Sequence, residues 1–143
     1  KLIVVESCTG GLFSSIFTSI PGSSKVFDFG LVTYSNFSKH FFCEVSNETL
    51  EKFGAVSKEV ASEMSKNLYN KINQQKIISI SCTGIAGPSG GNKNKPVGTV
   101  YISFHYTNKN ITFHKKFFNL KRTEIQLKTV EFMIEQGMKI INS

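Results

Sequence analysis

The sequence predicts an α/β fold, a three-layer α/β/α sandwich with a mixed, mostly parallel sheet. Two observations predict it. Short apolar runs rich in β-forming residues alternate with segments of helical periodicity, and a β-rich hairpin and one last amphipathic segment then follow. The 143 residues, of which 40% are hydrophobic, are enough for one core, and no repeat or long linker marks a second one. We therefore expect a single domain over residues 1–143.

The first elements follow from apolar spacing and turn residues. Residues 2–5 are a nearly continuous apolar run, typical of a buried strand, and residues 12–20 have helical spacing that a Pro-Gly pair ends. Residues 26–34 are rich in β-forming side chains and predict a second strand. Ser35 and Asn36 can then start a helix that carries Lys39 on its first turns.

Two helices and a third strand are expected next. Residues 48–53 predict a short helix closed by Gly54, and Ser57 is a candidate N-cap for a longer one. The longer helix has an i+4 ridge that we interpret as core packing: Val60, Met64, Leu68 and Ile72. Residues 76–82 form the third strand and lead into a glycine-rich connection.

The last part of the chain predicts a hairpin and a helix. Residues 97–105 and 111–118 pair as antiparallel strands around a loop at 106–110. Residues 123–126 match a capping box that opens the final helix. Its expected apolar stripe is Leu127, Val130, Ile134, Met138 and Ile141.

Composition excludes several classes of protein. The chain has a net charge of +7, but Arg122 is its only arginine and the lysines are spread from end to end, so we expect a lysine-coated surface and no nucleic-acid partner. Three cysteines without a C-x-x-C pair support neither a disulfide framework nor a zinc cluster, which favours a reducing, cytoplasmic setting. No apolar run approaches the roughly 20 residues needed to cross a bilayer, so no membrane association is expected.

Three polar or glycine-rich segments follow the predicted strands, at residues 6–11, 34–39 and 83–91. Ligands of open α/β sheets bind beyond the carboxyl ends of the strands. If the strands are parallel, the three segments converge on one cleft.

The first segment places Ser7, Cys8 and Thr9 where a helix begins, with Gly10 and Gly11 allowing close backbone approach. Free N–H groups at a helix start suit an anion or a developing oxyanion. The segment matches neither a P-loop nor a dinucleotide fingerprint. A capped helix start, with glycines that ease helix–strand packing, is the structural alternative.

Few residues can activate a nucleophile in this chain. The three histidines, His40, His105 and His114, lie in or beside apolar or basic sequence, and Asp28 is the only aspartate. The chain therefore has few residues for a Ser-His-Asp triad, and we interpret the histidines as structural. Lys39 remains as a base for a serine hydroxyl, with a solvated helix lysine as the alternative. A thiol at a helix start is a second candidate nucleophile, but no histidine is placed to pair with it.

Several ordered motifs together resemble one family, the CinA carboxy-terminal domain, also known as nicotinamide mononucleotide (NMN) deamidase or PncC-type amidohydrolase. The resemblance runs collinearly from Val5 to about Phe104 and then fades. The motifs are Glu6-Ser-Cys-Thr-Gly-Gly11, Pro21-Gly-Ser-Ser24, Gly30-Leu-Val-Thr-Tyr-Ser-Asn36 with Lys39, Gly54-Ala-Val-Ser57, Thr83-Gly-Ile-Ala-Gly-Pro88 with Gly90-Gly91, and Lys95-Pro-Val-Gly-Thr-Val100.

The resemblance implies a cytoplasmic, competence/damage-inducible-type enzyme of pyridine-nucleotide salvage that hydrolyses the carboxamide of NMN to nicotinic acid mononucleotide and ammonia. It implies a Ser/Lys dyad without metal or cofactor, a homodimer, and a helix before the first strand that lies outside this sequence. The catalytic residues it implies are Ser7, Lys39 and Tyr34. The implied substrate-binding residues are Cys8, Thr9, Gly10, Gly11, Ser24, Thr83, Gly84 and Arg122, of which Ser24 is also a reserve nucleophile.

The sequence departs from the family pattern at the start of the last helix. Where the family usually has G-D-R-x-x-V-R, this chain has Lys121 at the aspartate position and Gln126 at the second arginine, and it keeps Arg122. The kept arginine is a candidate for binding the substrate phosphate as a bidentate fork, or else an exposed helix-start cation. The alternative function is a pyridine-nucleotide or phosphate-binding module that keeps the pocket without turnover.

Overall fold

The computed structural model describes residues 1–72 and 76–142, and its elements match the predicted α/β class. In chain order they are β1 (Leu2–Glu6), α1 (Leu12–Thr18), a 3-10 turn η1 (Ser23–Lys25), β2 (Phe27–Val32), α2 (Asn36–Cys43), α3 (Asn47–Phe53), α4 (Lys58–Ile72), β3 (Ile78–Gly84), β4 (Thr99–Tyr106), β5 (Lys109–Lys116) and α5 (Arg122–Ile141).

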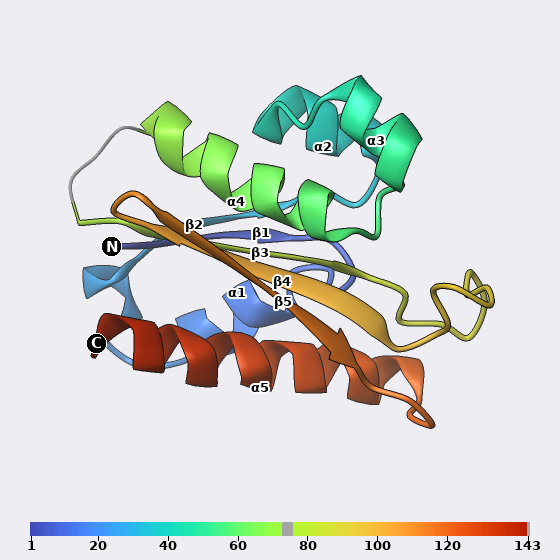
Figure 1. Ribbon diagram of the computed structural model, residues 1–143. Coiled ribbons are helices and arrows are strands. Elements are labelled where there is room, and N and C mark those ends of the chain that lie inside the picture. The colour runs from blue at the N-terminus through green and yellow to red at the C-terminus, as the bar shows by residue number, and fades with distance from the viewer. Residues whose placement is uncertain (73–75, 143) are drawn as a thin grey trace.

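A mixed five-stranded sheet forms the middle layer, in the order β2-β1-β3-β4-β5. β1 pairs in parallel with β2 and β3, whereas β4 pairs antiparallel with both β3 and β5. In the described part of the chain, four of the five strands therefore point the same way, and β4 alone is reversed. Figure 1 shows α2, α3 and α4 on one face of the sheet and α1 and α5 on the other. The predicted three-layer α/β/α sandwich is confirmed.

The strand order places the loops that follow β1 and β3 at the same edge of the sheet. The chain leaves β1 through α1 on one face to reach β2, and returns through α2, α3 and α4 on the opposite face to reach β3. Helices on opposite faces leave a crevice beyond the carboxyl ends of β1 and β3, the usual ligand position in open α/β sheets.

Each face of the sheet has its own apolar core. Towards α1 and α5 the sheet presents Val4, Ile80 and Phe104, and towards α2, α3 and α4 it presents Ile3 and Val5. Consecutive residues of β1 thus point into different cores, as the two-residue period of a strand requires. That double burial explains why residues 2–5 form a continuous apolar run.

The hairpin and the start of α5 differ from the sequence prediction. The expected loop at 106–110 is wrong, because Tyr106 already pairs with Lys109 and the turn is made by two residues, of which Thr107 has a left-handed φ of 50°. The capping box expected at 123–126 is also wrong. The helix begins at Arg122, and the Glu124 carboxylate accepts the backbone N–H of Lys121 at 2.7 Å.

The buried stripe of α5 is rotated from the predicted one. Leu127, Met138 and Ile141 are exposed, and the buried positions are Ile125, Thr129, Val130, Met133, Gly137 and Ile140. Two of these are not strongly apolar, which is why periodicity missed them. The Thr129 hydroxyl donates to the carbonyl of Ile125 at 2.7 Å, and Gly137 faces Ile80 and Phe104 of the sheet. No helix in residues 1–72 and 76–142 is long and apolar enough to cross a membrane.

Candidate active site

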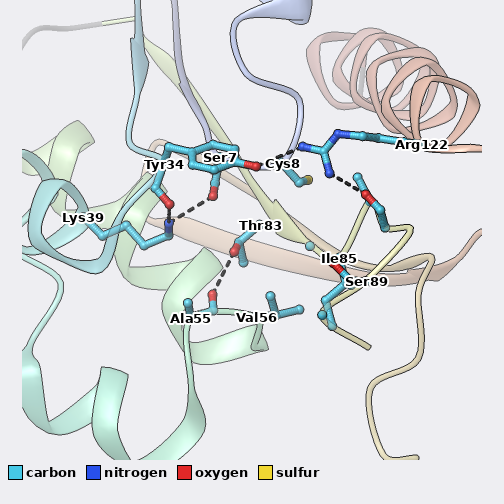
Figure 2. Close-up of a pocket in the computed structure, with 14 residues that line it drawn as sticks. Ser7, Cys8, Tyr34, Lys39, Ala55, Val56, Thr83, Ile85, Ser89 and Arg122 are labelled. Carbon is cyan, nitrogen blue, oxygen red and sulfur yellow. Dashed lines mark hydrogen bonds between the residues drawn. The ribbon is translucent and has the colours of Figure 1, made fainter. Parts of the chain in front are cut away.

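A cavity of about 250 Å³ lies at the crevice beyond β1 and β3. The loops after β1, β2 and β3, the α3–α4 loop and the first residue of α5 line it (Figure 2). The expected convergence of three strand-end segments on one site is therefore observed, with two additional contributors. None of the lining residues is an aspartate or a glutamate.

Glu6 organises the turn that carries Ser7. Its carboxylate is fully buried and accepts hydrogen bonds from the hydroxyl of Thr9 at 2.6 Å, the amides of Gly11 at 3.1 Å and Phe13 at 3.0 Å, and both the amide and hydroxyl of Ser14 at 2.9 and 2.7 Å. A negative charge at a helix N-terminus stabilises the dipole and the otherwise unpaired N–H groups. The anion at the start of α1 is therefore supplied by the protein itself.

This arrangement corrects the role expected for the glycine amides. The Gly11 amide binds Glu6, the Gly10 amide binds the carbonyl of Ser7 at 3.1 Å, and the Thr9 hydroxyl lies between Glu6 and the thiol of Cys82. These three residues do not line the cavity. Their geometry supports the turn, and the amides of Gly10 and Gly11 are not available to an oxyanion or a phosphate.

Lys39 points its amine at Ser7. Its Nζ lies 3.0 Å from Ser7 Oγ and 3.3 Å from the Tyr34 carbonyl (Figure 2). It also lies 2.8 Å from the Thr33 carbonyl, and the side chain is only 1% exposed. Ser35, at the N-cap of α2, accepts the Ser38 amide at 3.1 Å and so fixes the start of the helix that carries the lysine. Ser7 is held in turn by its own amide, which donates to the Cys82 carbonyl at 3.1 Å.

Burial lowers the pKa of Lys39 from its ordinary value of 10.5, because a charged amine loses hydration there. A neutral amine has two N–H groups and one lone pair. The carbonyls of Thr33 and Tyr34 can take both N–H groups, which leaves the lone pair to accept the hydroxyl proton of Ser7. In its neutral form, which burial favours, the amine is therefore placed to accept the serine proton.

Arg122 spans the mouth of the cavity. Its guanidinium donates to the Gly87 carbonyl at 2.6 Å and to the Tyr34 hydroxyl at 2.9 Å (Figure 2). Both acceptors are neutral, so the positive charge has no carboxylate partner among the described residues that line the cavity. Tyr34, predicted to orient the dyad, contributes its carbonyl to Lys39 and its hydroxyl to this contact.

Thr83 and Gly84, at the end of β3, also line the cavity. The Thr83 hydroxyl donates to the Ala55 carbonyl at 2.8 Å and ties the α3–α4 loop to the end of β3. A Cβ on Gly84 would lie 2.8 Å from the Thr99 carbonyl, so only glycine fits there. Residues 55–56 of the α3–α4 loop and residues 85–87, 89 and 90 after β3 also line the cavity. The segment after β3 was expected at the cleft, whereas the α3–α4 loop was not, although it belongs to a motif of the resemblance.

Two alternative nucleophiles are disfavoured. Ser24 lies exposed in η1, and its carbonyl accepts from Lys1 Nζ at 3.4 Å, at the start of β1 rather than at its carboxyl end. The structure therefore does not bring it together with the residues that line the cavity. Cys8 does line the cavity, but a hydrogen bond with Cys82 and burial raise the pKa of its thiol well above the ordinary value, so it stays protonated.

The three histidines lie outside the cavity. His40 Nδ1 lies 2.8 Å from the Val45 carbonyl, His105 packs on Tyr69 and His114 stacks on Tyr101, each pair with ring centroids 4.5 Å apart. In the described ranges, no group of three His, Cys, Asp or Glu side chains comes together in a way that could hold a metal ion.

A family model described as the CinA C-terminal domain matches residues 1–141. The chain belongs to this family. Among curated relatives of the CinA domain, a CinA-like protein of Prochlorococcus marinus (strain MIT 9301) is 50% identical over 129 residues. A putative competence-damage inducible protein of Thermoanaerobacter pseudethanolicus is 45% identical over 129 residues. Each alignment covers 90% of this chain and 30% of the relative, so the CinA domain described here spans less than a third of those proteins.

Solved structures share the fold of this CinA domain. The competence/damage inducible protein CihA from Agrobacterium tumefaciens has a TM-score of 0.91 and 38% identity, over 96% of this chain and 83% of that one. The competence damage-inducible protein A from Klebsiella pneumoniae has a TM-score of 0.92 and 27% identity, over 99% of this chain and 86% of that one. The predicted membership of the CinA family is thereby confirmed.

Proposed function

We propose that this CinA domain is a serine amidohydrolase that converts NMN to nicotinic acid mononucleotide and ammonia. The observation that supports the proposal best is the 3.0 Å contact between Ser7 Oγ and a buried Lys39 amine in a cavity without a carboxylate. A desolvated lysine beside a serine can act as a general base. The resemblance of the motifs to NMN deamidases supports the substrate.

In the proposed reaction, Ser7 Oγ attacks the carboxamide carbon while Lys39 accepts the hydroxyl proton. The C–N bond then breaks, and Lys39 gives this proton to the leaving nitrogen, so that ammonia departs and an acyl-enzyme remains. Water attacks the ester, again through the lysine, and the carboxylic acid and free serine result. We assign the oxyanion to the backbone N–H of Cys8, which follows the nucleophile, belongs to a residue that lines the cavity and has no backbone acceptor among the described residues.

The direct test is ammonia release from NMN, nicotinamide riboside and NAD by the purified protein, with the carboxylate product measured separately. We expect ammonia and nicotinic acid mononucleotide from NMN at the highest kcat/KM. Binding of NMN without ammonia release would reject the enzyme and leave the non-catalytic binding module. The three cysteines, all free and buried, fit a reducing compartment, and we place the reaction in the cytoplasm.

Arg122→Met is expected to raise KM for NMN by about 10- to 100-fold. The reason is that a hydrogen bond to a charged group contributes about 1.5–3 kcal/mol, and this arginine is the cation we assign to the substrate phosphate. Steady-state kinetics with nicotinamide riboside, which lacks the phosphate, should change little. Lys121→Met removes an exposed neighbouring charge and is the control. Equal losses with NMN and with the riboside would contradict phosphate binding.

We further propose that the protein forms a homodimer through α2. Phe37, Phe41 and Phe42 are 72%, 61% and 46% exposed; the rings of Phe37 and Phe41 stack, and Phe42 meets Phe41 edge to face. Lys39 is the only Lys, Arg, Asp or Glu between residues 29 and 43, and it is buried. Two chains of net charge +7 can therefore meet at this face without placing lysines against each other.

Phe41→Lys is expected to convert the dimer to a monomer, because it places a charge in the centre of each facing aromatic cluster. Sedimentation velocity of the wild type and the variant measures the change. Phe118→Lys, at another exposed phenylalanine, should leave the mass unchanged. A monomeric wild type at the highest concentration measured, or a dimeric Phe41→Lys variant, would reject this interface.

A further inference from the structure

The first turns of α5 contact all three strand-end loops that build the cavity. Arg122 reaches the Tyr34 hydroxyl after β2 and the Gly87 carbonyl after β3. Gln126, four residues later, donates from Nε2 to the Cys8 carbonyl after β1 at 2.9 Å. Residues four apart share one face of a helix. That face of α5 therefore joins three loops, the first of which lies 118 residues before Gln126 in the chain.

The turn that carries Ser7 is held by several hydrogen bonds, and the one from Gln126 is the one that comes from a different helix. Glu6 fixes the turn from within the β1–α1 connection, and Cys82 fixes the amide of Ser7 from the neighbouring strand. Gln126, in α5, instead donates a hydrogen bond to the carbonyl of the peptide unit between Cys8 and Thr9. Because a peptide unit is planar, fixing its carbonyl fixes the orientation of the whole unit.

We infer that Gln126 is a positioning residue for Ser7, which it acts on through the Cys8 carbonyl without touching the reacting atoms. The inference rests on the proposed serine mechanism. Ser7 Oγ must stay at hydrogen-bonding distance from the Lys39 amine and face the cavity at the same time. A displacement of about 1 Å in such a pair can cost about 100-fold in rate. Loss of the hydrogen bond from Gln126 to the Cys8 carbonyl would allow the turn to rotate and would move Ser7 Oγ away from the Lys39 amine.

The test compares Gln126→Met with Gln136→Met. Methionine has a similar length to glutamine and no N–H donor. Gln136 is the same residue type on the same helix, and its side chain makes no hydrogen bond within the described part of the chain, so it is a matched control. The probe is a serine-directed sulfonyl fluoride, and the readout is the rate of Ser7 modification measured by intact mass and peptide mapping. This readout does not depend on NMN being the substrate.

We expect Gln126→Met to slow modification of Ser7 by about 10-fold or more, with a thermal unfolding midpoint close to that of Gln136→Met. With NMN, kcat should fall by a similar factor while KM changes by less than about 3-fold, since the residue does not contact substrate. Gln126→Glu has the same shape but cannot donate, and it should be at least as slow.

Three results overturn the inference: unchanged labelling in Gln126→Met, an equal loss in Gln136→Met, or no labelling of Ser7 in the wild type. Failure of the proposed function is a separate result. A wild type that releases no ammonia from NMN, while its Ser7 is labelled and Gln126→Met slows that labelling, would reject the substrate and keep the positioning role.

Discussion

Ser7→Ala is expected to lower ammonia release from NMN by about 10⁴-fold or more while NMN binding is retained. The variant removes the only hydroxyl within reach of the Lys39 amine among the described residues, so neither the covalent step nor its proton transfer remains. Ammonia release measures the loss, and calorimetric titration with NMN measures the binding. Loss of one buried hydroxyl leaves the turn intact, because Glu6 and Cys82 hold it through other atoms.

Ser24→Ala is the control for this experiment, since that serine lies in η1 at the other end of β1. It should keep the full rate. Activity that survives in Ser7→Ala would transfer the nucleophile to Cys8 or Ser24, and the double variants with Cys8→Ala or Ser24→Ala would then identify which one.

Lys39→Met is expected to lower kcat by about 10²- to 10⁴-fold, the usual contribution of a positioned general base. Lys39→Arg should be as slow, because a guanidinium stays protonated and cannot accept the serine proton. Methionine leaves the carbonyls of Thr33 and Tyr34 without their donor, at a cost of about 1–3 kcal/mol for each one that stays buried. Thermal unfolding of each variant therefore accompanies the kinetics, and a folded variant with wild-type kcat would reject the dyad.

The same lysine predicts the pH dependence. Burial lowers the pKa of Lys39 below 10.5, and only its neutral form can accept a proton. At low pH the amine is charged and the reaction is slow. As pH rises through the lowered pKa, kcat/KM should rise and then level off, which a pH–rate profile from pH 5 to 10 measures. A rate that falls with rising pH across this range would contradict a lysine base.

The architecture and the place of the site were predictable from the sequence because both follow from local pattern. Apolar runs followed by polar turns indicate parallel strands, and the rule for open α/β sheets places ligands at their carboxyl ends. Ser7 and Lys39 each follow a predicted strand, so bringing them together needed only two adjacent parallel strands. β1 and β2 are such a pair.

Contacts between distant elements could not be predicted in this way. Arg122 meets Tyr34 across 88 residues and Gln126 meets Cys8 across 118, and no periodicity relates these positions. The stripe of α5 was misplaced for a related reason, because Thr129 and Gly137 are buried through small size and local hydrogen bonding rather than hydrophobicity. Glu6 was different. An acidic residue just before a helix start is a local signal for capping, and its bonds to the amides of Phe13 and Ser14 follow from that signal.

In the proposed amidohydrolase, the backbone carbonyls that surround the Lys39 amine would separate reactivity from selectivity. Main-chain atoms of Thr33 and Tyr34 orient the base, so side-chain changes at the cavity mouth leave the base aligned before any substrate arrives. Choice among amides then depends on the rim, formed by Arg122 and the loop after β3. A change of substrate in this scaffold therefore requires new residues at the rim, while the base and nucleophile can remain as they are.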